Sequence, residues 1–131
     1  MNKVEHIGIA VKDLQKAIQL YSALLGHPPY KEEPIASEDV TTSFFKAGDT
    51  KIELLEATDP KSPIARFIAK RGEGIHHIAF EVADIKSETE RLKQEGFELI
   101  GDIREGADNK LVCFIHPKSA NGVLVELCQE K

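Results

Sequence analysis

A strand-like segment that carries a histidine occurs twice in this sequence, and this repeat limits the folds that the chain can adopt. The first copy spans residues 4–11 and includes His6; the second spans residues 74–82 and includes His77. In both copies apolar residues alternate with small or polar ones, which is typical of a strand with one buried face. The repeat predicts two similar halves, each beginning with a histidine-bearing strand.

The segments that follow each copy also correspond. Asp13 is expected to cap a helix over residues 14–25, and Asp84 is expected to cap a helix that ends at Gly96. Three strands should follow each helix, which gives the order strand–helix–strand–strand–strand twice. These strands are predicted at residues 30–35, 40–47 and 51–56 in the first half and at residues 97–103, 111–115 and 123–128 in the second.

The two halves are predicted to form one domain. Module 1 covers residues 3–57, a connecting helix that begins at Ser62-Pro63 covers residues 62–71, and module 2 covers residues 74–129. Polar loops are expected at residues 104–109 and 116–122. The expected fold is α+β: two paired βαβββ modules that form an eight-stranded, open, cup-like mixed sheet with helices outside.

Composition excludes several classes of function. The chain has 131 residues, of which 41% are apolar and 30% charged, as in a soluble globular protein. The net charge is −5 and no basic stripe is present, so nucleic acid is not an expected partner. No long apolar run or signal peptide is visible, so we expect a cytoplasmic protein with no membrane contact. Cys113 and Cys128 lie in apolar runs and are expected to be buried side chains.

Strand alternation predicts that two histidines and two carboxylates share one concave face. His6 and Glu53 are 47 residues apart, and His77 and Glu126 are 49 apart, at matching places in the two halves. Imidazole and carboxylate donors together favour Co, Ni, Fe, Zn or Mn over Mg or Ca. Four such ligands on a six-coordinate ion would leave two positions for two oxygens of a substrate.

A lone histidine on a strand is more often structural than a metal ligand. The pairing of histidine with glutamate at matching positions of both halves is what favours metal binding here. The other three histidines do not share this pattern. His76 should point away from the concave face, His27 should be exposed, and His116 should be part of a loop.

Motifs along nearly the whole chain resemble a known superfamily. They are VEHIGIAV at residues 4–11, KIELLE at 51–56, SPIA at 62–65, GEGIHHIAFEV at 72–82 and HPKSANGVLVEL at 116–127. With these motifs the chain resembles the vicinal oxygen chelate superfamily, which includes glyoxalase I, extradiol dioxygenases and bleomycin-resistance proteins. Within it, the chain is similar to the methylmalonyl-CoA epimerase family.

The resemblance implies an isomerase that acts on an acyl-CoA substrate. It implies a homodimer with one divalent ion per chain (Co, Mn, Ni or Zn), held by His6, Glu53, His77 and Glu126. The implied reaction interconverts the (R)- and (S)-epimers of methylmalonyl-CoA by proton abstraction and return at Cα, through a metal-stabilised enolate.

Inversion at Cα needs two acid–base groups, and the resemblance implies Glu126 as one of them. Glu53, its symmetry mate, is our first candidate for the second, and Glu38 is the next. Some relatives carry a glutamate where this chain has Thr42, which cannot act as a base alone, so Thr42 is assigned to substrate binding. Lys118 and Ser119 are candidates for contacts with the substrate carboxylate or a CoA phosphate.

Two alternatives remain open at this point. Glyoxalase I (lactoylglutathione lyase) would use the same four ligands on the hemithioacetal of methylglyoxal and glutathione. A metal-free small-molecule binding or resistance protein is the second alternative. Such proteins typically lose the metal ligands, so the presence of all four counts against it.

Overall fold

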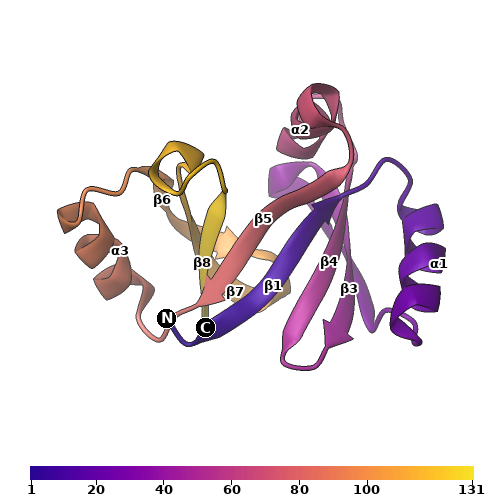
Figure 1. Cartoon of the computed structure of the whole chain (residues 1–131), viewed down its shortest axis with the longest axis horizontal. Helices are drawn as coiled ribbons and strands as arrows, with labels where there is room; N and C mark the ends of the chain where they lie inside the picture. Colours follow the sequence, from indigo (N-terminus) through magenta and orange to yellow (C-terminus); the bar gives the residue numbers. More distant parts are fainter. The chain divides into compact units, whose positions relative to one another are not determined.

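The computed structural model describes residues 1–131 and contains eight strands and three α-helices (Figure 1). The chain folds as two compact units. We call residues His6–His76 the first unit, and residues Met1–Glu5 together with His77–Lys131 the second unit. The backbone N–H of Asn2 donates to the carbonyl of Glu81, which ties the start of the chain to the second unit.

In the first unit the strands are ordered β2-β3-β4-β1. The strand β1 runs parallel to β4, whereas β3 is antiparallel to both β2 and β4. A two-residue turn at Gly48-Asp49 joins β3 to β4, as the sequence predicted. The elements are β1 (Lys3–Ala10), α1 (Leu14–Leu25), β2 (Lys31–Ile35), β3 (Val40–Ala47), β4 (Thr50–Ala57) and α2 (Pro63–Arg71).

Helix α1 begins and ends where the sequence predicts. The side chain of Asp13 accepts a hydrogen bond from the N–H of Lys16 at 3.1 Å, and Gly26 ends the helix with φ 84°. The apolar side of α1 packs against Ile52 and Leu54, on one face of β4. This burial fixes which face of the sheet is covered, and it leaves the alternate residues of β4 on the opposite face.

Helix α2 differs from the expectation that all helices lie on that same side. Ser62 caps it, as predicted, by accepting from the N–H of Ile64 at 3.1 Å. Ile64 then packs with Ala10 and Leu55, which belong to the opposite face from Leu54. Alternation in β4 explains the difference, because Leu54 and Leu55 are both apolar and each face therefore offers a surface to a helix.

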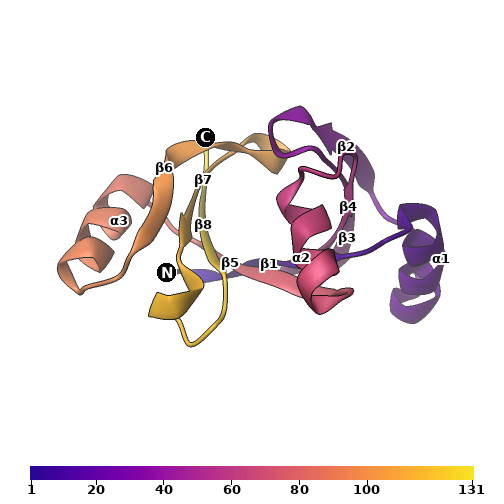
Figure 2. The same cartoon turned by 90° about the horizontal axis from the view of Figure 1, so that it is seen from above.

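The second unit repeats this plan, with the strand order β5-β8-β7-β6. Strand β5 is parallel to β8, and β7 is antiparallel to both β8 and β6. Helix α3 packs against Leu127 and Phe80 and lies beside β6 in Figure 2. The elements are β5 (Gly74–Glu81), α3 (Ile85–Gln94), β6 (Leu99–Gly106), β7 (Lys110–Ile115) and β8 (Val125–Glu130).

Both units hold the first turn of their first helix in the same way. A carboxylate oxygen of Glu56 accepts from the N–H of Leu14 at 3.1 Å, and the amide oxygen of Gln129 accepts from the N–H of Ile85 at 2.7 Å. Each acceptor follows the glutamate of its parallel strand by three residues. The repeat therefore extends to hydrogen bonds that the apolar pattern does not reveal.

Several strand boundaries in the second unit correct the sequence expectations. The loop expected at residues 104–109 is shorter, because β6 continues to Gly106 and a 3₁₀ turn covers Ala107–Asn109. The last strand begins at Val125 rather than at residue 123. The first error has a physical cause: the register of β6 with β7 shifts between Ile100 and Arg104, and such a bulge breaks the alternation on which the prediction rested.

The expected α+β fold is confirmed, with mixed parallel and antiparallel pairing and the βαβββ order in both units. None of the helices has the length and apolar character that crossing a membrane requires.

Candidate metal and substrate site

A buried histidine–glutamate pair lies in the first unit. The Nδ1 atom of His6 is 3.2 Å from Oε2 of Glu53, and each residue is 5% exposed. Parallel pairing of β1 with β4 brings them together, because Gly8, two residues after His6, lies opposite Glu53. A buried carboxylate needs a charge partner or hydrogen bonds. The His6 imidazole is the polar group that lies beside the Glu53 carboxylate here.

The second unit contains the equivalent pair. The Nε2 atom of His77 is 3.1 Å from Oε1 of Glu126, and the two residues are 6% and 7% exposed. Here Ala79, two residues after His77, lies opposite Glu126 in the parallel ladder of β5 and β8. The two pairs therefore occupy the same register position in the two units, as the sequence repeat predicted.

A phenylalanine lies across the antiparallel ladder from each glutamate. Phe44 is opposite Glu53, and Phe114 is opposite Glu126. The Phe114 ring also meets the His77 ring edge-on, with 6.2 Å between centroids. An apolar ring on one side of each carboxylate excludes water from it and strengthens its electrostatic interactions.

A cationic side chain lies over each of these two phenylalanine rings. The Lys31 ammonium lies 4.8 Å from the centroid of Phe44, and the Arg104 guanidinium lies 5.0 Å from the centroid of Phe114. Sequence reasoning missed all four residues. Phe44 and Phe114 precede their glutamates by 9 and 12 residues, so unequal hairpins hid the repeat.

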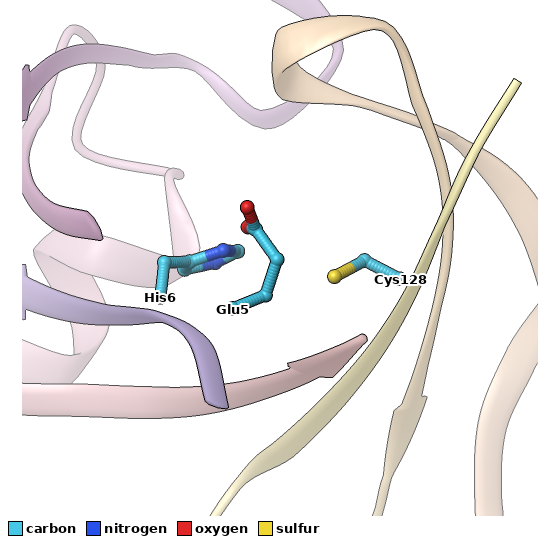
Figure 3. A group of neighbouring side chains, drawn as sticks. All are labelled: Glu5, His6 and Cys128. Atoms are coloured by element: carbon cyan, nitrogen blue, oxygen red, sulfur yellow. The ribbon is translucent and has the colours of Figure 1, made fainter. Parts of the chain in front are cut away.

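A second buried carboxylate, Glu5, was also missed. It is 2% exposed, and a carboxylate oxygen lies within 4.8 Å of Sγ of Cys128, a buried thiol on β8. Figure 3 shows Glu5 beside His6 on β1, with the sulfur of Cys128 directed toward Glu5. The signal available in the sequence was a charged residue inside a strand, directly before a candidate ligand.

The two cysteines are buried and not joined by a disulfide, in line with the sequence interpretation. Burial raises the pKa of the Cys113 thiol to about 11, and the negative charge of Glu126 adds to the shift. Cys113 therefore stays protonated at neutral pH and is a poor nucleophile.

Thr42 and Glu38 precede Glu53 in the first unit. Thr42 is 1% exposed and pairs with Leu55, so it lies on the same face as Glu53, two residues along β3 from Phe44. Glu38 is half-buried in the 3₁₀ turn Ala36–Glu38 that leads into β3.

The loop that carries Lys118 and Ser119 is held by hydrogen bonds of its own. The N–H of Lys118 donates to Nδ1 of His116 at 3.0 Å, and the hydroxyl of Ser119 accepts from the N–H of Glu98 at 3.0 Å. The exposed ammonium of Lys118 lies 2.7 Å from the Glu98 carboxylate and lowers the pKa of that carboxyl. In this structure both candidate residues contact Glu98.

The remaining histidines have structural surroundings. His76 meets the Phe67 ring edge-on at 5.0 Å between centroids, so it packs on α2. His27 is exposed, with its ring 6.3 Å from that of Phe45. The exposure of His27 agrees with the position expected from the Pro-Pro sequence.

Comparison with known proteins defines the class to which this fold and this donor set belong. Residues 5–114 match the model of the glyoxalase/bleomycin resistance protein/dioxygenase superfamily. The chain belongs to this superfamily.

Relatives that match nearly the whole chain define the branch. An ethylmalonyl-CoA/methylmalonyl-CoA epimerase of Cereibacter sphaeroides is 41% identical, over 98% of both chains. The crystal structure of methylmalonyl-CoA epimerase from Mycobacterium tuberculosis is 36% identical, with a TM-score of 0.93 over 98% of this chain and 87% of that one. A methylmalonyl-CoA epimerase in complex with methylmalonyl-CoA and NH4+ is 32% identical, with a TM-score of 0.95 over 99% and 95% of the two chains. The resemblance to epimerases is confirmed, and these relatives are isomerases.

Proposed function

We propose that this chain interconverts the epimers of methylmalonyl-CoA by removing and returning the proton on Cα. One observation carries the proposal: a buried histidine–glutamate pair occupies the same register position in both units of a chain that matches epimerases over nearly its full length. The acyl-CoA substrate is taken from those relatives. The glyoxalase I alternative is not favoured, because the relatives that match nearly the whole chain and are named for an activity are epimerases.

We propose His6, Glu53, His77 and Glu126 as the ligands of one divalent ion. The donor set fits such an ion: two imidazoles and two buried carboxylates supply nitrogen and oxygen donors and two formal negative charges. When bound, the ion would supply Lewis-acid stabilisation of the negative charge that develops on the substrate. Co, Mn, Ni and Zn are the candidate metals.

Glu126 and Glu53 are the proposed acid–base residues. Inversion requires one group that takes the proton from one side of Cα and a second that returns it to the other. Glu126 is flanked by Phe114 and His77, and these two side chains shield its carboxylate from water. Glu53 has the equivalent surroundings next to Phe44, and Glu38 is retained as the alternative second base.

Lys118, Ser119 and Thr42 are proposed to bind the substrate. Thr42 lies on the same sheet face as Glu53. The exposed Lys118 can exchange its contact with Glu98 for a CoA phosphate, because an ion pair on the surface is weak. A homodimer and a cytoplasmic location complete the proposal.

The test is deuterium exchange at Cα of methylmalonyl-CoA in D₂O. Protein loaded with Co²⁺ or Mn²⁺ should exchange the proton and interconvert the epimers, and a chelator should stop both. The His77→Ala variant should lose the activity, whereas His27→Ala, which replaces an exposed histidine, should keep it. Turnover of methylglyoxal with glutathione, without exchange on the CoA ester, would contradict the proposal.

A further inference from the structure

We propose that Arg104 binds the carboxylate of the methylmalonyl group and so makes the site specific for a malonyl-type thioester. This inference rests on the proposed function. The guanidinium of Arg104 lies 5.0 Å from the centroid of the Phe114 ring, and the residue is exposed. Phe114 in turn lies opposite Glu126 in the sheet.

Arg104 is thus linked to the catalytic pair through one aromatic ring. Phe114 meets His77 edge-on at 6.2 Å, and Nε2 of His77 is 3.1 Å from the carboxylate of Glu126. All four residues belong to the second unit. A substrate whose Cα is presented to Glu126 would therefore have the Arg104 guanidinium near its reacting end, next to the Phe114 ring.

The bulge in β6 gives Arg104 this position. Ile100 pairs with Phe114, and an unbroken register from there would put Arg104 opposite Lys110. Because the register shifts, Arg104 lies opposite Val112 instead. The shift moves it two residues, roughly 7 Å along the strand, toward Phe114. Bulges commonly redirect a side chain next to a functional site.

Gly101 lies within the bulge and adopts the left-handed conformation that the bulge requires. Its φ is 69°, and a β-carbon there would lie 3.5 Å from Nη1 of Arg104. The guanidinium therefore packs close to a position that has no side chain. A side chain at 101 would strain the backbone, because this φ is rarely adopted by residues that have a β-carbon.

The chemistry of the substrate explains the need for this cation. A methylmalonyl thioester brings a carboxylate toward Glu126, which is itself an anion when it acts as a base. A guanidinium offsets that repulsion, and its planar fork matches a carboxylate through two hydrogen bonds. The equivalent cation of the first unit, Lys31, is a single ammonium without the planar fork of a guanidinium, so we assign this role to Arg104.

The test compares two CoA ligands that differ by one carboxylate. Binding of malonyl-CoA and of propionyl-CoA to Co²⁺-loaded protein is measured by calorimetry. The wild type should bind malonyl-CoA more tightly, and Arg104→Gln should reduce that preference roughly tenfold to hundredfold, as expected for a lost hydrogen bond to a charged group. Arg104→Lys should recover part of it, and the KM of epimerisation should rise more than kcat falls.

Arg91→Gln is the matched control, because Arg91 pairs with Glu88 on the surface of α3 in the same unit. Circular dichroism checks that every variant is folded. If Arg104→Gln weakened the binding of malonyl-CoA and propionyl-CoA equally, Arg104 would contact the CoA moiety that the two share, and the proposal would be overturned. If the binding of both ligands were unchanged, Arg104 would only pack on Phe114, and this outcome would also overturn the proposal. Failure of the proposed function is a separate result: a wild type without Cα exchange.

Discussion

At the scale of single residues, the two glutamates owe their chemistry to what surrounds them. Glu53 and Glu126 each lie between a histidine and a phenylalanine, although one pair uses Nδ1 of its imidazole and the other uses Nε2. Strand alternation was enough to find these residues, because a side chain in a regular strand has only two possible faces.

Replacing Glu126 by glutamine should remove an acid–base group while keeping the shape of the side chain. We expect the rate of Cα exchange to fall by about 10²–10⁴-fold. Cobalt titration should show that the ion is still bound. Glu130→Gln, at the exposed end of the same strand, is the control and should be near wild type. Near-native exchange in Glu126→Gln would remove Glu126 from the mechanism.

The Cys113 thiol should make the metal-free protein less stable in alkali. It ionises near pH 9.0 in the unfolded chain and at about pH 11 in the fold, so the unfolded state loses its proton first as the pH rises. Below pH 9 the thiol is protonated in both states, and its ionisation does not lower the free energy of unfolding. Between pH 9 and 11 that free energy falls. By pH 10 the loss is about 1.3 kcal/mol. Urea unfolding at pH 8 and pH 10 should show a smaller decrease in Cys113→Ala, and equal decreases in both proteins would refute the assignment.

At the scale of elements, the helices were more predictable than the strands. The bounds of α1 follow from Asp13 and Gly26, since local capping residues and a regular apolar stripe decide them. The end of β6 could not be predicted in the same way. Gly101 adopts a left-handed conformation inside a bulge, which changes the register and makes a strand from residues that resemble a loop. Arg104 was missed for the same reason.

The two aspartate caps should contribute similarly to stability. Asp13 and Asp84 each accept from an N–H three residues on, at 3.1 Å. Substitution of either by alanine should lower the free energy of unfolding by about 1 kcal/mol. Glu90→Ala, an exposed position inside α3, is the control and should change it by less than about 0.5 kcal/mol. A cap variant as stable as the wild type in urea would contradict this account.

At the scale of the whole molecule, the repeat was the most informative feature of the sequence. It predicted the βαβββ order of both units and the pairing of each histidine with its glutamate. It did not reveal the cations over Phe44 and Phe114, because those residues lie at different sequence distances from the glutamates. Spacing follows loop length, whereas pairing follows the sheet register, and only the structure gives the register.

The proposed four-ligand site predicts that neither half suffices for metal binding. Cobalt at one hundred times its dissociation constant should stabilise the wild type by about 2.7 kcal/mol. His6→Ala and His77→Ala, one change in each unit, should both lose most of this gain in thermal unfolding. His27→Ala should keep it. If either of the first two variants retained the full cobalt effect, the ion would be bound by a single unit.

The matched register of the two pairs also has an evolutionary consequence. In each unit the residue two positions after the histidine lies opposite the glutamate, and the first turn of the helix is held by the residue three positions after that glutamate. Such agreement is what tandem duplication of one ancestral half leaves behind. On the proposed ligand set, that ancestor supplied two donors and needed a second copy of itself for the other two. In that account, fusion through the segment that carries α2 would allow the two copies to diverge, and the lysine over Phe44 against the arginine over Phe114 is one such difference.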